Sequence, residues 1–161
     1  MQESPYLQGR EHLIEKFRTI PFMKALNRGC MQEILCMSKM RKYEPGERII
    51  QEGVFDCWFY IILSGKVRVV KHNTEIVRLE NIGEIFGEMA VIDGEARSAS
   101  VFADTETVCL AIDASFLERL KPNDRNVFYS AFYRLLAEIL ANRLRATNEE
   151  LARVKHKLED S

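Results

Sequence analysis

Short runs of alternating apolar and polar residues occupy the middle of the chain and are separated by glycine or by Asn and Asp. The runs are rich in Val, Ile and aromatic residues, which favour pleated, half-buried strands. Because short strands with tight turns between them assemble into antiparallel closed structures, we expect a barrel or jelly roll. The predicted strands cover residues 48–51, 57–63, 66–71, 75–79, 99–103 and 107–112.

Apolar residues recur at helical spacing on both sides of this region. Pro21 is expected to break the segment between two N-terminal helices, and Pro122 is expected to interrupt the chain between two C-terminal helices. Asp113 is expected to cap the first helix of the C-terminal pair. The predicted helices cover residues 11–17, 31–40, 114–120 and about 123–158.

The predicted fold class is α+β and mainly β: a double-stranded β-helix or jelly-roll barrel with N-terminal helices, one short helix in the barrel region and a long C-terminal helix. Three segments are expected along the chain. Residues 1–42 form an N-terminal helical segment, residues 43–112 the β-barrel core, and residues 113–161 the C-terminal helices. A chain of 161 residues is long enough for one such domain with a substantial hydrophobic core.

The stretch over residues 86–101, FGEMAVIDGEARSASV, opens with a glycine and a short apolar helical turn. Gly87 has no Cβ, so its backbone can approach a ligand closely. A helical turn through Glu88, Met89 and Ala90 directs unpaired amide donors at an anion. Glu88 repels phosphate, so in a pocket it is better suited to accept a hydrogen bond from a sugar hydroxyl.

Arg97 follows a turn formed by Asp93 and Gly94 in the same stretch. Its planar fork of five N–H donors matches two phosphate oxygens in a way that lysine cannot. Ser98 adds a hydroxyl donor beside it. Singly, these residues are common in turns, on solvated surfaces and in strands, so the argument depends on their order and spacing. Together they suit a phosphorylated sugar.

The whole stretch resembles the phosphate-binding cassette of the cyclic nucleotide-binding domain family. The resemblance extends over residues 43–111, and the chain is also similar to the regulatory-subunit domains of protein kinase A. It implies a bound cyclic AMP, with its phosphate on Arg97, Ser98 and the amides of the short helix and its ribose on Glu88. Cyclic GMP stays open as the ligand, because Ser98 and Ser100 place hydroxyls near the phosphate and near a guanine in the syn conformation.

The long C-terminal helix carries apolar residues in alternating steps of four and three, which is the seam pattern of a coiled coil. In that register Glu150 takes a g position and Lys155 the following e′ position, which favours pairing across a parallel dimer. The alternative is a single amphipathic helix packed on its own domain. The predicted seam residues of a parallel homodimer are Leu140, Leu144, Thr147, Leu151, Val154 and Leu158.

Thr147 is a polar residue at a seam position, so it needs either a register-setting role or a ligand. The segment over residues 143–150, RLRATNEE, resembles the corresponding helix of the catabolite activator protein family. That resemblance implies that Thr147 meets the adenine amino group and that Asn148 reaches the ligand of the other subunit. It also implies that Arg143 lies near the ribose and its glutamate. Ser100 departs from that family, which has a tryptophan there.

The predicted ligand-binding residues are Phe86, Gly87, Glu88, Met89, Ala90, Arg97, Ser98, Ala99, Ser100, Arg143, Thr147 and Asn148.

A formal net charge of -1 argues against a broad nucleic-acid surface. The sequence stops at Ser161 without a second helix-turn-helix pattern, so we expect no direct DNA contact within this chain. No apolar run approaches the length of a membrane span, and the N-terminus lacks the features of a signal peptide. We therefore expect a cytoplasmic protein without membrane contact.

The pattern also lacks the residues of a catalytic or metal centre. His12, His72 and His156 lie far apart without metal-ligand spacing. A cyclic nucleotide hydrolase would need metal ligands, or a nucleophile with a base. We therefore predict a binding protein with no metal, no cofactor besides its ligand and no enzymatic activity. The cysteines form no Cys-x-x-Cys pair and are expected to be buried free thiols: Cys30, Cys36, Cys57 and Cys109.

Three alternatives stay open. The chain is the sensor part of a transcription regulator of the catabolite activator type that lacks its DNA-binding domain, or a regulatory domain of a larger channel, kinase or transporter. The third alternative is a dimeric scaffold that binds no nucleotide. The presence of Glu88 and Arg97 argues against the scaffold.

Overall fold

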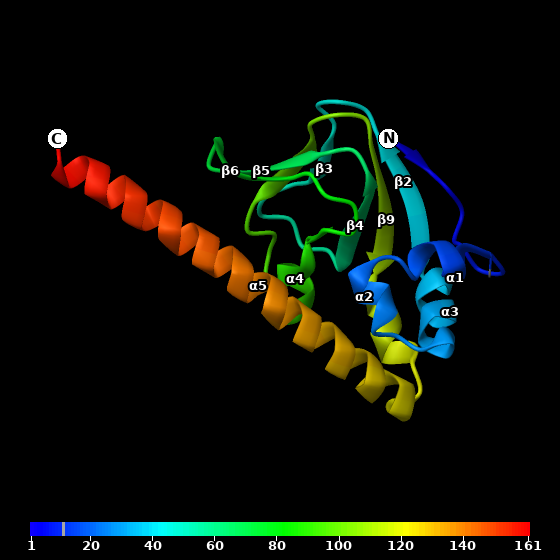
Figure 1. Ribbon diagram of the computed structural model, residues 1–161. Helices are drawn as coiled ribbons and strands as arrows, with labels where there is room; N and C mark the ends of the chain where they lie inside the picture. The colour runs from blue at the N-terminus through cyan, green and yellow to red at the C-terminus, as the bar shows by residue number, and fades with distance from the viewer. Residues whose placement is uncertain (11) are drawn as a thin grey trace.

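The computed structural model describes residues 1–10 and 12–161. Its strands are β1 (Gln2–Glu3), β2 (Ser38–Tyr43), β3 (Arg48–Ile50), β4 (Trp58–Ser64), β5 (Val67–Lys71), β6 (Thr74–Leu79), β7 (Ile85–Phe86), β8 (Ser100–Ala103) and β9 (Thr107–Asp113). They form two antiparallel sheets, one in the order β1-β2-β9-β4-β7 and the other in the order β3-β8-β5-β6. The sheets form the two walls of a barrel (Figure 1). The predicted jelly-roll fold is confirmed.

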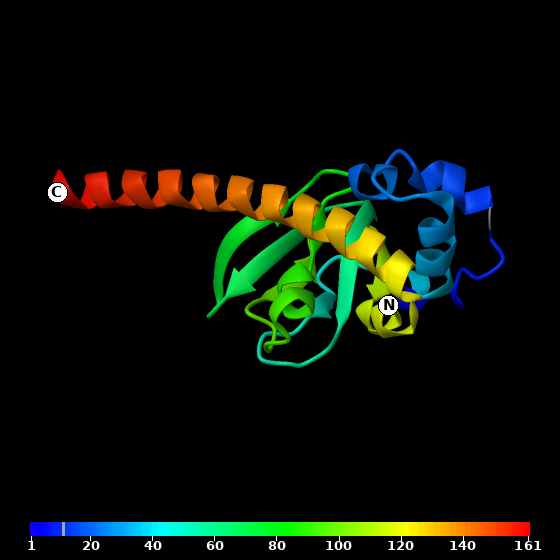
Figure 2. The same cartoon turned by 90° about the horizontal axis from the view of Figure 1, so that it is seen from below.

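Helices cover the outer face of the five-stranded sheet (Figures 1 and 2). They are α1 (His12–Phe17), α2 (Pro21–Lys24), α3 (Arg28–Cys36), the 3₁₀ helix η1 (Ala114–Arg119) and α5 (Pro122–Glu159). The short helix α4 (Glu88–Asp93) instead follows β7 and contacts β4. As expected, the side chain of Asp113 caps η1 by accepting a hydrogen bond from the amide of Ser115 at 3.0 Å. Pro21 and Pro122 begin α2 and α5, because the first turn of a helix does not need the missing N–H.

The sequence of β4 shows why two cores flank one sheet. Phe59 and Ile61 point to the helices and pack in the helical core, whereas Tyr60 and Ile62 point into the barrel. A strand with two buried faces has no polar side, so its residues read as one continuous apolar run. The helical core also contains a cluster of rings in which Phe22 lies 5.6 Å from Phe132.

The predicted helix over residues 31–40 is wrong at both ends. The observed helix α3 begins at Arg28 under an Asn27 cap, whose side chain accepts a hydrogen bond from the amide of Cys30 at 2.8 Å, and ends at Cys36. All six residues of β2 then pair with β9, from Ser38 opposite Ile112 onward. The open edge of β9 needs backbone partners, and this long-range demand overrides the local helical spacing.

The remaining differences are smaller. Residue 11, where the first helix is predicted to begin, lies outside the described residues. The division of the chain at residues 42 and 113 stays a prediction, and β2 crosses the first of these boundaries. Cys30 and Cys109 are buried as expected, but Cys57 is exposed and Cys36 is half-buried. Cys57 lies at the start of the strand region, where its Sγ is 3.3 Å from Asp113 Oδ1.

Candidate functional site

Gly87 joins β7 to α4 with a left-handed backbone, at φ 80°. A Cβ at this position would lie 3.0 Å from Arg97 Nη1, 3.0 Å from Ile50 Cδ1 and 3.3 Å from the carbonyl oxygen of Trp58. Both the positive φ and the crowding require glycine. The turn therefore brings the backbone at the start of the short helix against the Arg97 side chain.

Arg97 is buried, with 4% of its surface exposed. Its Nε and Nη2 donate to the two carboxylate oxygens of Asp56, with an Nε–Oδ2 distance of 3.2 Å. Nη2 also donates to the carbonyl oxygen of Trp58, and Nη1 donates to that of Gly87 at 2.7 Å. Four of the five N–H groups are thus used, and one N–H of Nη1 has no partner among the described residues.

Asp56 is a site residue that the sequence reasoning missed. It lies in the loop between β3 and β4, more than 40 positions from Arg97 in sequence. The same loop pairs with the Arg97 backbone, because Gly53 N donates to Arg97 O and Arg97 N donates to Val54 O, each at 2.9 Å. A lone aspartate in a loop carries no local signal of this role. Only the fold brings it to the arginine, which it holds in one orientation.

Glu88, the first residue of α4, is also buried, with 3% of its surface exposed. Its Oε1 accepts a hydrogen bond from Arg143 Nη1 of α5 at 2.5 Å, and the other end of that guanidinium donates to the carbonyl oxygen of Ile85. A buried carboxylate needs such a partner, because an unpaired charge is costly out of water. The contact ties α5 to the cassette. Glu88 Oε2 has no partner among the described residues.

The serines of the stretch take different positions. Ser98 is exposed, and its Oγ lies 3.8 Å from Met89 Sδ, while its carbonyl oxygen accepts from Lys71 Nζ at 2.6 Å. Ser100 faces the outside of the barrel, where its Oγ accepts a hydrogen bond from the amide of Glu52 at 2.9 Å. The structure thus places Ser98 beside the cassette helix and directs the Ser100 hydroxyl away from the barrel interior.

Three apolar residues of the stretch over residues 86–101 are buried or half-buried beside its charged groups. Phe86 is buried inside the barrel and stacks on Tyr60 with ring centroids 5.0 Å apart. Ala90 is buried and Ala99 half-buried. Burial raises the pKa of Tyr60, and it raises the pKa of the Cys109 thiol inside the barrel to about 12. Tyr60 and Cys109 are both buried beside residues 86–101, and burial from water strengthens any charge pairing there.

Thr147 and Asn148 are not brought to the cassette within one chain. Both are exposed on the part of α5 that extends past the barrel (Figure 2). Thr147 Oγ1 donates to the carbonyl oxygen of Arg143, one turn earlier, at 2.8 Å. Of the three ligand residues predicted on α5, Arg143 is thus the one that contacts Glu88 within the described part of the single chain.

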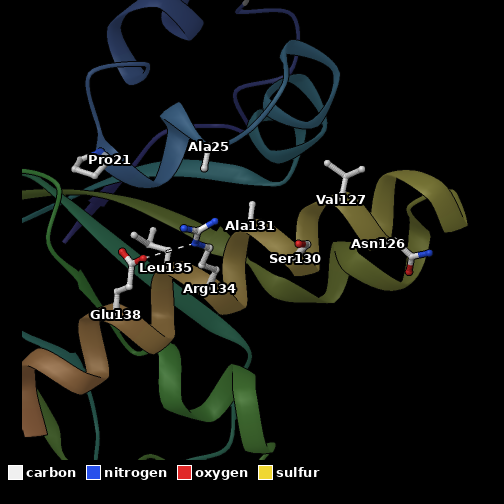
Figure 3. Close-up of a pocket in the computed structure, with 9 residues that line it drawn as sticks. All are labelled: Pro21, Ala25, Asn126, Val127, Ser130, Ala131, Arg134, Leu135 and Glu138. Atoms are coloured by element: carbon white, nitrogen blue, oxygen red, sulfur yellow. Dashed lines mark ion pairs between the residues drawn. The ribbon is translucent and has the colours of Figure 1, made fainter.

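A groove of about 790 Å³ lies elsewhere, between α2 and α5. Pro21 and Ala25 form one side, and the other side includes Leu135 and an ion pair of Arg134 Nε with Glu138 Oε1 at 3.7 Å (Figure 3). None of the predicted ligand-binding residues lines it. This groove is therefore not the site that the sequence predicts.

Two negative findings concern the part of the chain that the structure describes. There, no three His, Cys, Asp or Glu side chains are grouped so that they could hold a metal ion. None of the helices there combines the length and the apolar character that crossing a membrane requires.

The barrel, the glycine-led helix and the buried arginine define a class. Residues 40–124, just over half of the chain, match the cyclic nucleotide-binding domain family, and the chain belongs to that family. This is a regulatory, ligand-binding family and not a catalytic one.

Among its relatives, a cGMP-dependent protein kinase of Eimeria tenella is 33% identical over 69% of this chain and 11% of that protein. A cAMP-dependent protein kinase type II regulatory subunit of Drosophila melanogaster is 30% identical over 69% of this chain and 29% of that protein. The chain thus spans less than a third of either relative. The crystal structure of a cyclic nucleotide-binding domain from Methylobacillus flagellatus shares the fold, with a TM-score of 0.74 at 24% identity over 91% of this chain and 86% of that one.

Proposed function

We propose that this chain is a cyclic nucleotide sensor that binds cyclic AMP in its barrel and passes the signal to α5. The observation that carries the proposal is the pair of buried opposite charges at the Gly87 turn. Glu88 is the first residue of α4 and Arg97 follows the end of that helix, and both are almost fully buried. Burying such groups is costly unless they serve a partner, and each retains hydrogen-bonding capacity for one.

The phosphate would bind at Arg97. Asp56 already holds the guanidinium in place, so little ordering entropy remains to be lost when an oxyanion arrives. The free N–H of Nη1 would donate to one phosphate oxygen, and the exposed Ser98 hydroxyl would donate to another. Arg97 thereby acts as a pre-oriented clamp, and Asp56 acts as its positioning residue.

The ribose would bind at Glu88, whose Oε2 is available to accept from a hydroxyl. Arg143 shares that carboxylate, so an occupied pocket changes the environment of a residue on α5. A ligand shifts a conformational equilibrium only through contacts that differ between the states. The link from Glu88 to Arg143 connects the pocket to the long helix, and it would serve as such a contact if the ribose changes it.

The exposed part of α5 would form the dimer interface and would contact the base of the nucleotide. Leu144 is 61% exposed and Leu158 is 69% exposed, which disfavours a monomer in water. Tyr133 and Ala137 lie seven residues before Leu140 and Leu144, and both are exposed, so the seam extends toward the barrel. A second α5 packed in parallel would cover this stripe and bring Thr147 and Asn148 toward the bases.

Of the alternatives, a regulatory domain of a larger, kinase-linked protein fits best, because the two relatives described are a cyclic nucleotide-dependent kinase and a regulatory subunit of one. Their names also divide between cGMP and cAMP, so cyclic GMP is the competing ligand. The exposed hydroxyl of Ser98 suits either nucleotide.

Isothermal titration calorimetry of the chain with cyclic AMP and with cyclic GMP tests the function. We expect binding at micromolar levels or tighter, with cyclic AMP preferred. The absence of heat with both nucleotides at those concentrations overturns the proposal. Tighter binding of cyclic GMP than of cyclic AMP would identify cyclic GMP as the ligand instead.

The variant Arg97→Ala should lose about 2–5 kcal/mol of binding free energy, because a buried phosphate loses its charged partner. Arg97→Lys keeps the positive charge but not the planar fork of donors, so its affinity for the nucleotide should lie between those of the wild type and Arg97→Ala. Arg134→Ala is the matched control, since Arg134 lies on the far groove and is largely exposed. Circular dichroism verifies that each variant is folded. Unchanged affinity in a folded Arg97→Ala protein would place the phosphate elsewhere.

A further inference from the structure

The four-stranded sheet has an outer face that the nucleotide pocket does not use. The strand register places Arg48 of β3 opposite Phe102 of β8, Phe102 opposite Arg68 of β5, and Arg68 opposite Arg78 of β6. Val101, the neighbour of Phe102, points the other way into the barrel core. Directly opposed residues share a face of a sheet. Three arginines and one phenylalanine therefore form a row across the outer face.

The arginines of this row differ in how far they are neutralised. Arg78 donates to Glu75 at 2.6 Å and to Asp104 at 2.9 Å. Arg68 forms a longer ion pair, with its Nε 3.9 Å from Asp104 Oδ1, and its guanidinium lies 5.0 Å from the centre of the Phe102 ring. Within the described residues, the side chains of Arg68 and Arg48 make no hydrogen bond. Their donors are available to a ligand.

A hollow of about 270 Å³ adjoins Arg68 on this face. Asn73 stands at its rim, held there by the two-residue turn between β5 and β6, where His72 and Asn73 have φ values of 48° and 62°. Its lining residues are Glu52, Arg68, Val70, Asn73, Ser100 and Phe102.

The hydrogen-bonding capacity left in the hollow is mainly of the donor type. Glu52 is the carboxylate there, and it already faces the His72 amide at 3.4 Å, His72 Nε2 at 3.3 Å and Lys71 Nζ at 3.7 Å. Within the described residues, the guanidinium of Arg68 pairs with Asp104 at 3.9 Å without a hydrogen bond, and the side-chain NH₂ of Asn73 makes no hydrogen bond. A complementary ligand must therefore offer acceptors. The charge of Arg68, which Asp104 compensates only in part, and that of Arg48 make an anion the favoured acceptor.

We propose that this hollow is a second binding site, for a small organic oxyanion in which a carboxylate or a phosphate is attached to an apolar body. The planar fork of Arg68 binds two oxygens of the anion, and the Asn73 amide donates a further hydrogen bond. Arg48 adds a second positive charge at the far side of Phe102. The apolar body lies on Val70 and on the exposed part of the Phe102 ring, which gives the site the mixed lining of small-molecule pockets.

Two-dimensional ¹H–¹⁵N NMR of the whole chain tests the site with three probes: benzoate, phenyl phosphate and the uncharged benzyl alcohol. Saturable shifts are expected at millimolar concentrations for both anions, confined to residues 68–73 and 100–104. Benzyl alcohol should produce none. Whichever anion binds more tightly shows whether the site prefers a carboxylate or a phosphate. Shifts at Gly87 to Ala90 report the barrel pocket separately, so the outcome does not depend on nucleotide binding.

The variant Arg68→Gln removes the positive charge that lines the hollow and should weaken anion binding by about tenfold, as expected for a lost charged hydrogen bond. Arg78→Gln is the matched control, since Arg78 belongs to the same row but does not line the hollow. Its affinity should stay within about twofold of the wild type. Both positions are partly exposed, so the folded spectrum should persist. Absence of localised shifts, equal shifts with benzyl alcohol, or unweakened binding to Arg68→Gln overturns the proposal.

Discussion

The two halves of α5 have the same kind of apolar spacing and different environments. In the first half, residues 122–139, Phe128, Phe132 and Leu136 are buried against the helical core. In the second half, residues 140–159, the stripe continues with Leu144, Leu151 and their successors, which are exposed in the single chain. Periodicity thus identifies an apolar stripe, but the stripe does not reveal whether its partner is the same chain or another one.

Phe132→Ala should have the largest effect, and it tests the first half. The ring is fully buried and lies 5.3 Å from that of Phe59, so its loss should cost about 3–5 kcal/mol of unfolding free energy. Urea denaturation followed by circular dichroism measures this cost. Arg134→Ala, which changes a largely exposed side chain on the same part of α5 and off the proposed seam, should cost less than about 1 kcal/mol. Equal costs would contradict the assignment of the two faces.

Leu151→Ala tests the second half. If the exposed stripe is a dimer seam, the truncation should weaken dimerisation by about 2–3 kcal/mol while leaving the barrel folded. Sedimentation equilibrium measures the dissociation constant. Glu149→Ala lies off the seam and serves as the control. A wild-type chain that remains monomeric at high micromolar concentration would refute the dimer, and the exposed stripe would need another partner.

Arg143→Gln tests the junction between the halves. The Glu88 carboxylate loses its charged partner, at a cost of about 1–2 kcal/mol, a value reduced because the arginine side is one-third exposed. Amide hydrogen exchange over residues 140–147 should accelerate in the nucleotide-free protein. Arg145→Gln, which changes an exposed arginine that contacts Asn142, should leave the exchange unchanged. Equal acceleration in both variants would show that Arg143 does not anchor the helix.

Thr147→Ala should have the smallest effect. Loss of one hydroxyl contact to the adenine amino group should reduce the preference for cyclic AMP over cyclic GMP by about 1 kcal/mol. Competition between the two nucleotides in calorimetry gives this preference directly, with Glu149→Ala again as the control. If the affinity for both nucleotides falls equally, Thr147 does not read the base.

The sequence was informative where local chemistry and local structure coincide. The strands around Trp58 and Thr107 were predicted to within one or two residues, because alternation and turn glycines act within a few positions. Gly87, Glu88 and Arg97 were singled out because each performs a task that few other residue types can perform. The structure buries both charged groups of this set beside the same turn.

The predictions that failed depend on contacts between residues that are distant in the sequence. The spacing of apolar residues predicts a helix from Met31 to Met40, but the residues from Ser38 onward belong to β2 and pair with β9. Asp56 carried no signal, because its partner is distant in sequence. Ser100 looked like a pocket hydroxyl, yet the pleat directs it to the outer face, since neighbouring strand residues point to opposite sides.

By itself, therefore, the sequence determined the family, the barrel and the residue types that suit a phosphorylated sugar, since these depend on backbone preferences and side-chain chemistry over short distances. Only the tertiary structure decided which groups meet: Asp56 with Arg97, Arg143 with Glu88, and a row of arginines across one sheet. Such pairings depend on strand register and helix direction, which long-range packing sets for the chain as a whole.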